Sequence, residues 1–181
     1  MTQFSSDKTL ITKENAYPIL KAFAKEYKKQ NGTSVPIEVV IVGGGSILLN
    51  YGFRETTQDF DIMTQSMGVI KDVSHRIADL YNLPDNWLNT DFMRTASYSD
   101  KLREVSKHFC SFNNGSLEFR TVNGEYLIAM KMVSAREYRN DISDVVGILI
   151  YMKNDSADFS MDRIEHAIDF LYGKWENIVK E

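Results

Sequence analysis

The sequence predicts a single domain of the α/β (α+β) class, in which a small mixed sheet is flanked by helices. The chain has 181 residues, of which 43% are hydrophobic and 25% charged, and this suits one globular domain with a sizeable core. Strand-like runs alternate with segments of helical apolar periodicity. We place the core of the domain at about 37–150, and we expect added helices at both ends, the last at about 160–179.

The composition limits the functions that are open to the chain. A net charge of −4 argues against a general nucleic-acid binder. The single cysteine, Cys110, allows no disulfide within the chain, and the N-terminal residues lack the apolar stretch of a signal peptide. No apolar run approaches the ~18 residues of a membrane span. We therefore expect a cytoplasmic protein without a membrane partner.

Three consecutive elements in residues 37–63 organise the chain. The run 37–42 is β-branched and apolar apart from Glu38, which predicts a buried strand. A glycine turn follows, and residues 46–53 then fit a short helix. A glycine turn at a helix N-terminus offers backbone N–H groups that can bind a phosphate. The residues of this predicted nucleotide-binding turn are Gly43, Gly44, Gly45 and Ser46.

Residues 58–63 predict a strand that presents two carboxylates on one face. Side chains two apart share a face, so Asp59 and Asp61 point the same way while Phe60 and Ile62 face the core. Adjacent carboxylates repel each other, and a divalent cation removes the repulsion. Mg²⁺ suits such a pair, because it is commonly held by one or two carboxylates together with substrate phosphates. The simpler alternative is a surface glycine turn followed by an edge strand with two solvated aspartates.

Two other glycine motifs fit this stretch less well. A P-loop ends in Gly-Lys-Ser/Thr, whereas Ile47 follows the Gly45-Ser46 pair here. A dinucleotide fingerprint needs a third glycine at the position of Leu48, and it needs a crossover helix longer than residues 46–53.

The Gly-Gly-Gly-Ser turn, the short helix and the Thr-x-Asp-Phe-Asp-Ile strand together resemble the signature of the nucleotidyltransferase superfamily with the DNA polymerase β-like fold. The matching residues are Gly44, Ser46, Asp59 and Asp61. The resemblance implies a polymerase β-like fold with a nucleoside triphosphate as substrate. It also implies Mg²⁺ or Mn²⁺ held by Asp59 and Asp61, and transfer of a nucleoside monophosphate to an acceptor by a two-metal mechanism.

The elements around this stretch follow from apolar periodicity and turn residues. A first helix is capped by Thr12 or Asn15 and ends near Gln30. A second helix covers 69–81, and a turn region at 82–89 comes after it. Asp91 follows this region; it is a candidate for an extra carboxylate, but we favour a position on the loop surface. The inner face of the second helix is predicted to consist of Val73, Ile77 and Leu80.

A short helix from Ser99 to His108 precedes a predicted β-hairpin with strands 109–112 and 117–122. On its second strand, Glu118 and Arg120 share a face. The superfamily commonly uses a third carboxylate on a later strand beside the two aspartates, and the resemblance makes Glu118 the candidate. The alternative is an ordinary Glu–Arg pair that contributes roughly a few tenths of a kcal/mol.

Residues 125–137 and 138–152 predict two further helices. The run L-x-A-M-K-M-x-x-A-R, followed by R-x-D-x-x-D, resembles the second half of the abortive-infection type nucleotidyltransferases, which include toxins of toxin–antitoxin pairs. In that family a lysine and a following aspartate belong to the active site, and Lys131 and Asp144 match them. The alternative for Lys131 is a surface lysine whose stem packs on apolar neighbours. Other residues in or near this pattern are Arg136, Arg139 and Asp141.

On the second of these helices, an apolar stripe of Ile142, Val145, Ile148 and Leu149 is expected opposite the aspartates.

The resemblances imply an active site made of Asp59, Asp61, Glu118, Lys131 and Asp144, and they leave the acceptor open. It could be a tRNA, a protein hydroxyl or a small molecule. The functional alternative is a catalytically inactive nucleotide-binding or antitoxin-like partner-binding module. The last amphipathic helix shows no chemistry; it either packs on the core or binds a helical partner or a second copy of the chain.

Overall fold

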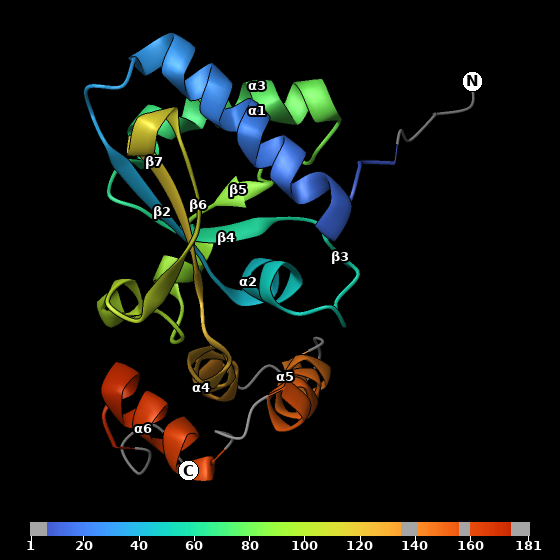
Figure 1. Ribbon diagram of the computed structural model, residues 1–181, viewed down its shortest axis with the longest axis vertical. Coiled ribbons are helices and arrows are strands. Elements are labelled where there is room, and N and C mark those ends of the chain that lie inside the picture. Colours follow the sequence, from blue (N-terminus) through green and yellow to red (C-terminus); the bar gives the residue numbers. More distant parts are fainter. Residues whose placement is uncertain (1–6, 135–140, 156–159, 175–181) are drawn as a thin grey trace.

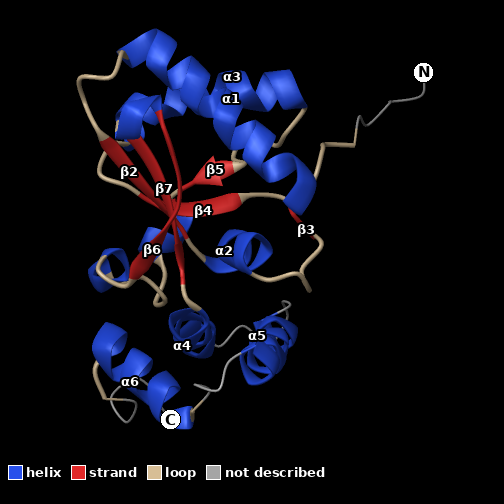
Figure 2. Ribbon diagram, in the orientation of Figure 1, coloured by secondary structure: helices blue, strands red, loops and turns tan. Residues whose placement is uncertain are grey.

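The computed structural model describes residues 7–134, 141–155 and 160–174. Its centre is a five-stranded mixed sheet, and helices pack around it, so the predicted α+β class is confirmed (Figure 2). β2 pairs antiparallel with β4 on one side and parallel with β7 on the other. In sheet order the strands are β5 (Leu88–Asn89), β4 (Phe60–Met63), β2 (Ile37–Ile41), β7 (Leu117–Val122) and β6 (Ser106–Phe112).

Helices lie on both sides of the sheet (Figure 1). The first group, α1 (Lys13–Asn31) and α3 (Met67–Tyr81), covers one face. The second group, which lies on the other side of the short helix α2, consists of α4 (Gly124–Ser134), α5 (Asp141–Asp155) and α6 (Met161–Tyr172). α2 itself spans Gly43–Asn50 and follows directly after β2.

The central strand β2 is buried on both faces, which explains its unbroken apolar sequence. Val39 and Ile41 join an apolar cluster with α1 and α3. Val40, together with Val42 just after the strand, joins a second cluster with α4 and α6. The rigid placement of β2 therefore fixes the start of α2 between the two clusters.

The first helix begins and ends as the sequence predicts. Thr12 Oγ1 accepts a hydrogen bond from the Asn15 N–H, and Asn15 Oδ1 accepts one from the Thr12 N–H, which makes a capping box. Gly32 follows the last turn with a φ of 70°, a left-handed value that favours glycine. The same N-terminal segment forms β1 (Ile11–Thr12), which pairs with β3 (Thr56–Thr57) in a small second sheet.

Two predicted boundaries are wrong. α2 begins at Gly43 and ends at Asn50, so the glycines form its first turn and do not precede it. The predicted helix from Ser99 to His108 shrinks to one 3-10 turn, Asp100–Arg103, and His108 already belongs to β6. Short apolar patterns do not distinguish a helix from a strand, and here the hairpin pairing decides.

Two predicted inner-face residues are also wrong. Leu80 is 71% exposed, although Val73 and Ile77 of the same predicted face are buried. Ile142 is 70% exposed, although Ile148 of the same stripe is buried, and the stripe does not lie opposite Asp144, which is 4% exposed. The buried residues of α6 are Ile164, Ala167, Ile168 and Leu171, and they pack into the second cluster. The part of the predicted last helix from residue 175 onward lies outside the described residues.

Within the described part of the chain, none of the helices combines the length and the apolar character that crossing a bilayer demands.

Candidate active site

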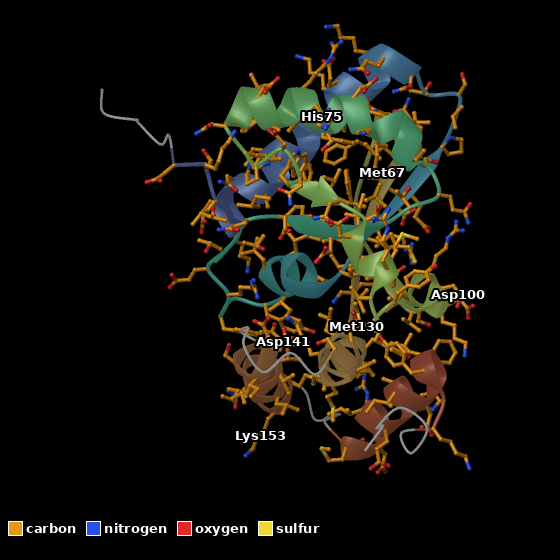
Figure 3. All side chains as sticks on the ribbon, turned by 180° about the vertical axis from the view of Figure 1, so that it is seen from behind. Met67, His75, Asp100, Met130, Asp141 and Lys153 are labelled. Carbon is orange, nitrogen blue, oxygen red and sulfur yellow. The ribbon has the colours of Figure 1, made fainter. Side chains whose placement is uncertain are left out.

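A cavity of about 720 Å³ lies at the end of β2, where α2 begins. Its lining comes from the start of α2, the segment 54–61, the segment 86–97, and the facing parts of α4 and α5. Figure 3 labels two lining residues, Met130 of α4 and Asp141 of α5, and they lie together below α2. His75, labelled on α3, lies on the far side of the sheet from these two residues.

Both aspartates of the Asp-x-Asp pair line this cavity. Asp61 belongs to β4 and Asp59 directly precedes it, while Phe60 and Ile62 are fully buried in the core behind them. Asn89, on the neighbouring β5, donates a hydrogen bond to Asp59 Oδ2 at 3.3 Å. The alternation of the strand thus turns the two carboxylates to the cavity, as predicted from the sequence.

The start of α2 meets the aspartates across the cavity wall. Gly43 has a φ of 55°, which favours glycine, and a Cβ there would lie 3.7 Å from Asp61 Oδ2. The preceding residue, Val42, provides no side-chain cap. The first N–H groups of a helix have no partner inside it and carry its positive partial charge. Gly43 and Gly44, which both line the cavity, therefore offer N–H groups to an anion.

Gly45 and Ser46 do not line the cavity, which corrects the prediction that they bind the nucleotide. A Cβ on Gly45 would lie 2.5 Å from Phe60 Cδ1 and 2.9 Å from Ile41 Cγ2, so core packing explains this glycine. The Ser46 hydroxyl is buried, accepts from the Val122 N–H at 2.8 Å and donates to the Val122 carbonyl at 3.3 Å. It ties α2 to β7 and is turned away from the cavity.

Lys131 and Asp144 meet in the cavity wall, as their common match to one motif suggested. Lys131 Nζ lies 3.0 Å from Asp144 Oδ2 and also donates to Asp141 Oδ1. The three side chains are largely buried, with exposed fractions of 16% for Lys131, 6% for Asp144 and 13% for Asp141. Arg136 and Arg139 lie outside the described residues.

Sequence reasoning missed Arg54. Its Nη1 donates to both carboxylate oxygens of Asp144, at 2.8 and 3.0 Å, and it lines the cavity. The available signal was an arginine in the loop just before the Asp-x-Asp strand, but its partner lies on α5, far along the chain. Asp91 was expected on the loop surface; it is exposed, yet it also lines the cavity.

The structure does not bring Glu118 together with Asp59 and Asp61. Glu118 pairs in register with Glu38, whereas the Asp61 backbone carbonyl accepts the N–H of Val42, four residues after Glu38. At roughly 3.3 Å per residue this separates the backbone positions of Glu118 and Asp61 by about 13 Å along the strand direction, on opposite sides of β2, and Glu118 does not line the cavity, so one metal ion would not bridge the two residues. The face is the predicted one, but the third-carboxylate assignment is wrong.

Glu118 has other partners. Arg120 Nη1 donates to Glu118 Oε1 at 2.7 Å, and His108 Nδ1 lies 3.2 Å from the same oxygen. Partial burial acts to raise the pKa of the Glu118 carboxyl, but the hydrogen bonds from His108 and Arg120 outweigh it and lower that pKa. The alternative of an ordinary Glu–Arg pair therefore describes this residue, with Arg120 on the same strand and His108 across the hairpin.

The oxygen ligands in the cavity suit a hard cation that arrives with phosphates. Among the described residues, no group of three or more histidine, cysteine or acidic side chains lies close enough to hold a metal ion by itself. Asp59 and Asp61 provide two carboxylates on one wall, and Mg²⁺ commonly takes one or two carboxylates plus substrate oxygens. The donor set fits a metal ion bound together with a polyphosphate.

The cavity thus combines an exposed helix start, a pair of carboxylates, and two cations held by buried aspartates. Its volume of about 720 Å³ is in the range typical of sites for small molecules. A family model described as "Nucleotidyltransferase of unknown function (DUF6036)" matches residues 19–174. Neither the curated proteins nor the solved structures gave a match.

Proposed function

The chain belongs to this family of nucleotidyltransferases of unknown function, and on that premise we propose that it transfers a nucleoside monophosphate from a nucleoside triphosphate to an acceptor in the cavity at the start of α2. The observation that carries the proposal is the meeting of Asp59 and Asp61 with Gly43 and Gly44 on one cavity. A phosphate site and a metal site are thereby adjacent, which the transfer of a nucleotidyl group requires.

Gly43 and Gly44 are proposed to hold the triphosphate. Their N–H groups lie at the positive end of α2, and negative charge is stabilised there. A side chain on either glycine would occupy the space next to these N–H groups. The triphosphate would then lie beside Asp61, whose carboxylate is close to Gly43.

Asp59 and Asp61 are proposed to hold Mg²⁺ or Mn²⁺ together with the phosphates. A bound divalent ion would neutralise charge on the phosphates and lower the pKa of the acceptor oxygen. Asn89, which donates to Asp59, would keep that carboxylate turned to the cavity. A second ion, as in the two-metal mechanism, would need a further acidic ligand, and Asp91 is the candidate on the same cavity.

Lys131 is proposed to neutralise a phosphate as a point charge. Asp144 and Asp141, which contact its ammonium group, would hold it in place before the nucleotide binds. The phosphates would then meet a lysine whose position is already fixed. Less free energy is therefore needed to reorganise the site during the reaction.

A second candidate is a nucleotide-binding module without catalysis. It is favoured by one observation, that Glu118 does not reach the aspartates and so cannot act as their third carboxylate. Such a module would keep the phosphate and metal sites but would not turn over. We also propose that the acceptor is a tRNA, a protein hydroxyl or a small molecule. A role in a toxin–antitoxin pair is likewise a proposal.

The test uses each nucleoside triphosphate labelled at either the α- or the γ-phosphate, with Mg²⁺ or Mn²⁺ and whole-cell extract. Transfer of α-label but not of γ-label to an acceptor fraction, with loss of transfer in Asp61→Asn, supports the proposal. Transfer of the γ-label would indicate a kinase. Binding of the nucleotide without transfer of either label would favour the binding module.

A further inference from the structure

Arg54 lies between the start of α2 and the buried carboxylate of Asp144. A Cβ on Gly44 would lie 2.8 Å from both Cζ and Nη2 of Arg54, so the guanidinium group sits directly over this glycine. On its other side, Arg54 Nη1 donates to Asp144 at 2.8 and 3.0 Å. The side chain is 21% exposed and lines the cavity.

The hydrogen-bond donors of Arg54 divide into two sets. Nη1 is used by Asp144, and Nε donates to the Thr56 carbonyl at 3.3 Å. Nη2, the nitrogen over Gly44, donates to no group among the described residues. Asp144 and Thr56 therefore fix the orientation of the guanidinium plane while one nitrogen remains available beside the N–H groups of α2.

Asp144 connects Arg54 to Lys131. Its carboxylate, with a side chain 6% exposed, accepts both from Arg54 Nη1 and from Lys131 Nζ at 3.0 Å. A buried carboxylate between two cations holds both side chains in place. Arg54 and Lys131, the positive groups among the described residues that line the cavity, are thus positioned by one aspartate before any ligand binds.

We propose that Arg54 binds the terminal phosphates of the nucleoside triphosphate through Nη2, against the start of α2, and that Asp144 is its positioning residue. The inference rests on the proposed function and adds to it a residue that selects a triphosphate over a monophosphate. A guanidinium group carries several donors in one rigid plane, so two of its nitrogens can be held by Asp144 and Thr56 while Nη2 is directed at a phosphate oxygen, which the single ammonium group of a lysine cannot do. Arginine in this position can hold Asp144, Thr56 and a phosphate at once.

A purely structural role is the competing explanation, in which Arg54 only ties its loop to α5. That role predicts lower stability without any change in phosphate selectivity. The two explanations therefore differ in one measurable quantity, the ratio of the dissociation constants for a nucleoside monophosphate and the corresponding triphosphate.

The experiment measures this ratio by calorimetric titration of the full chain with Mg²⁺ and each nucleotide, for the wild type, Arg54→Gln, Arg54→Lys and Asp144→Asn. Wild type is expected to prefer the triphosphate. Arg54→Gln should reduce the preference by about tenfold or more, since it removes charge-assisted hydrogen bonds. Arg54→Lys should lie in between, and Asp144→Asn should reduce the preference although it leaves Arg54 itself unchanged.

Arg76→Gln is the matched control. Arg76 also pairs with a carboxylate, with its Nη1 2.9 Å from Glu26 Oε1, but it belongs to α3 and does not line the cavity. The ratio of the dissociation constants for monophosphate and triphosphate should be the same in Arg76→Gln as in the wild type. Unfolding curves of every variant check that the compared proteins are folded, and Arg54→Lys carries the test if Arg54→Gln fails to fold.

An unchanged ratio in a folded Arg54 variant would overturn the inference, and so would a wild type without preference for the triphosphate. Failure of the proposed function looks different. If the wild type binds the triphosphate, loses its preference on Arg54→Gln and yet transfers no label, the inference holds and the transferase proposal fails.

Discussion

The Ser46 hydroxyl accepts a hydrogen bond from the Val122 N–H at 2.8 Å, and this bond ties the first turn of α2 to the last residue of β7. The same hydroxyl donates to the Val122 carbonyl at 3.3 Å and accepts from the side-chain nitrogen Nδ2 of Asn50 at 3.4 Å. A motif serine that a sequence match places next to a phosphate therefore acts as a buried link between two elements.

The first prediction follows from this link. Ser46→Ala should lower the free energy of unfolding by about 1–3 kcal/mol, because it removes the buried hydroxyl that accepts from the Val122 N–H, while the Val122 carbonyl keeps its bond from the Asn50 side chain at 2.8 Å. Nucleotide affinity should stay close to that of the wild type. Urea unfolding and nucleotide titration of the same preparation give both values. Intact stability with lost nucleotide binding would instead place the hydroxyl in the phosphate site.

The second prediction contrasts Gly44 with Gly45. Gly44→Ala should keep the fold, because the atoms nearest to its Cβ belong to the end of the Arg54 side chain, at 2.8 Å, and not to the core, and it should weaken nucleotide binding because it displaces that guanidinium group. Gly44→Val should abolish binding. Gly45→Ala should cost about 1–3 kcal/mol of stability, because its Cβ would overlap Phe60 and Ile41 in the core. Thermal unfolding with and without nucleotide compares the variants, and equal behaviour of Gly44→Ala and Gly45→Ala would contradict this reading of the turn.

The third prediction concerns the metal ion. With a nucleoside triphosphate present, Mg²⁺ or Mn²⁺ should stabilise the wild type, by roughly 2.7 kcal/mol when the ligand is at a hundredfold excess over its dissociation constant. Asp61→Asn removes one carboxylate from the cavity and should lose most of this effect. A thermal-shift series over metal concentration measures it. Equal shifts in wild type and variant would mean that the metal ion does not bind at Asp61.

The fourth prediction concerns Glu118 and pH. The pKa of this carboxyl is lowered from its ordinary value of 4.5 in the folded chain, so its charged form stabilises the fold above that value, and the contribution is lost as pH falls through the folded-state pKa. Glu118→Gln should therefore be less stable than the wild type at pH 7, by less than ~1 kcal/mol, and the difference should vanish in acid. Nucleotide binding should not change. A stability difference that persists in acid, or lost nucleotide binding, would contradict this assignment.

Local sequence patterns predicted the part of the site that one short stretch supplies. The alternation from Asp59 to Ile62 predicted that both carboxylates lie on the face opposite Phe60 and Ile62; both line the cavity, although β4 itself begins at Phe60 and Asp59 directly precedes it. The strand β2, the first helix and the hairpin followed equally from local patterns. These features depend on residues close together in the chain.

The features that the sequence did not predict depend on long-range register and packing. Glu118 lies on the predicted face, but its position along β7 is set by pairing with Glu38, and periodicity cannot fix such a register. Arg54 acquires its position only when α5 packs against its loop and brings Asp144 to it. Leu80 and Ile142 are exposed although their helices bury the rest of the predicted faces, because the packing of the neighbouring elements decides how far along each helix the core extends.

The central claim is tested most directly by the rate at which the α-label is transferred from a nucleoside triphosphate. This rate is measured under identical conditions for wild type, Asp59→Asn, Asp61→Asn and Glu118→Gln. Each aspartate variant should lose at least about a hundredfold in rate while Glu118→Gln transfers at the wild-type rate, because Asp59 and Asp61 line the cavity and Glu118 does not. Wild-type rates in both aspartate variants, or loss of transfer in Glu118→Gln alone, would contradict it.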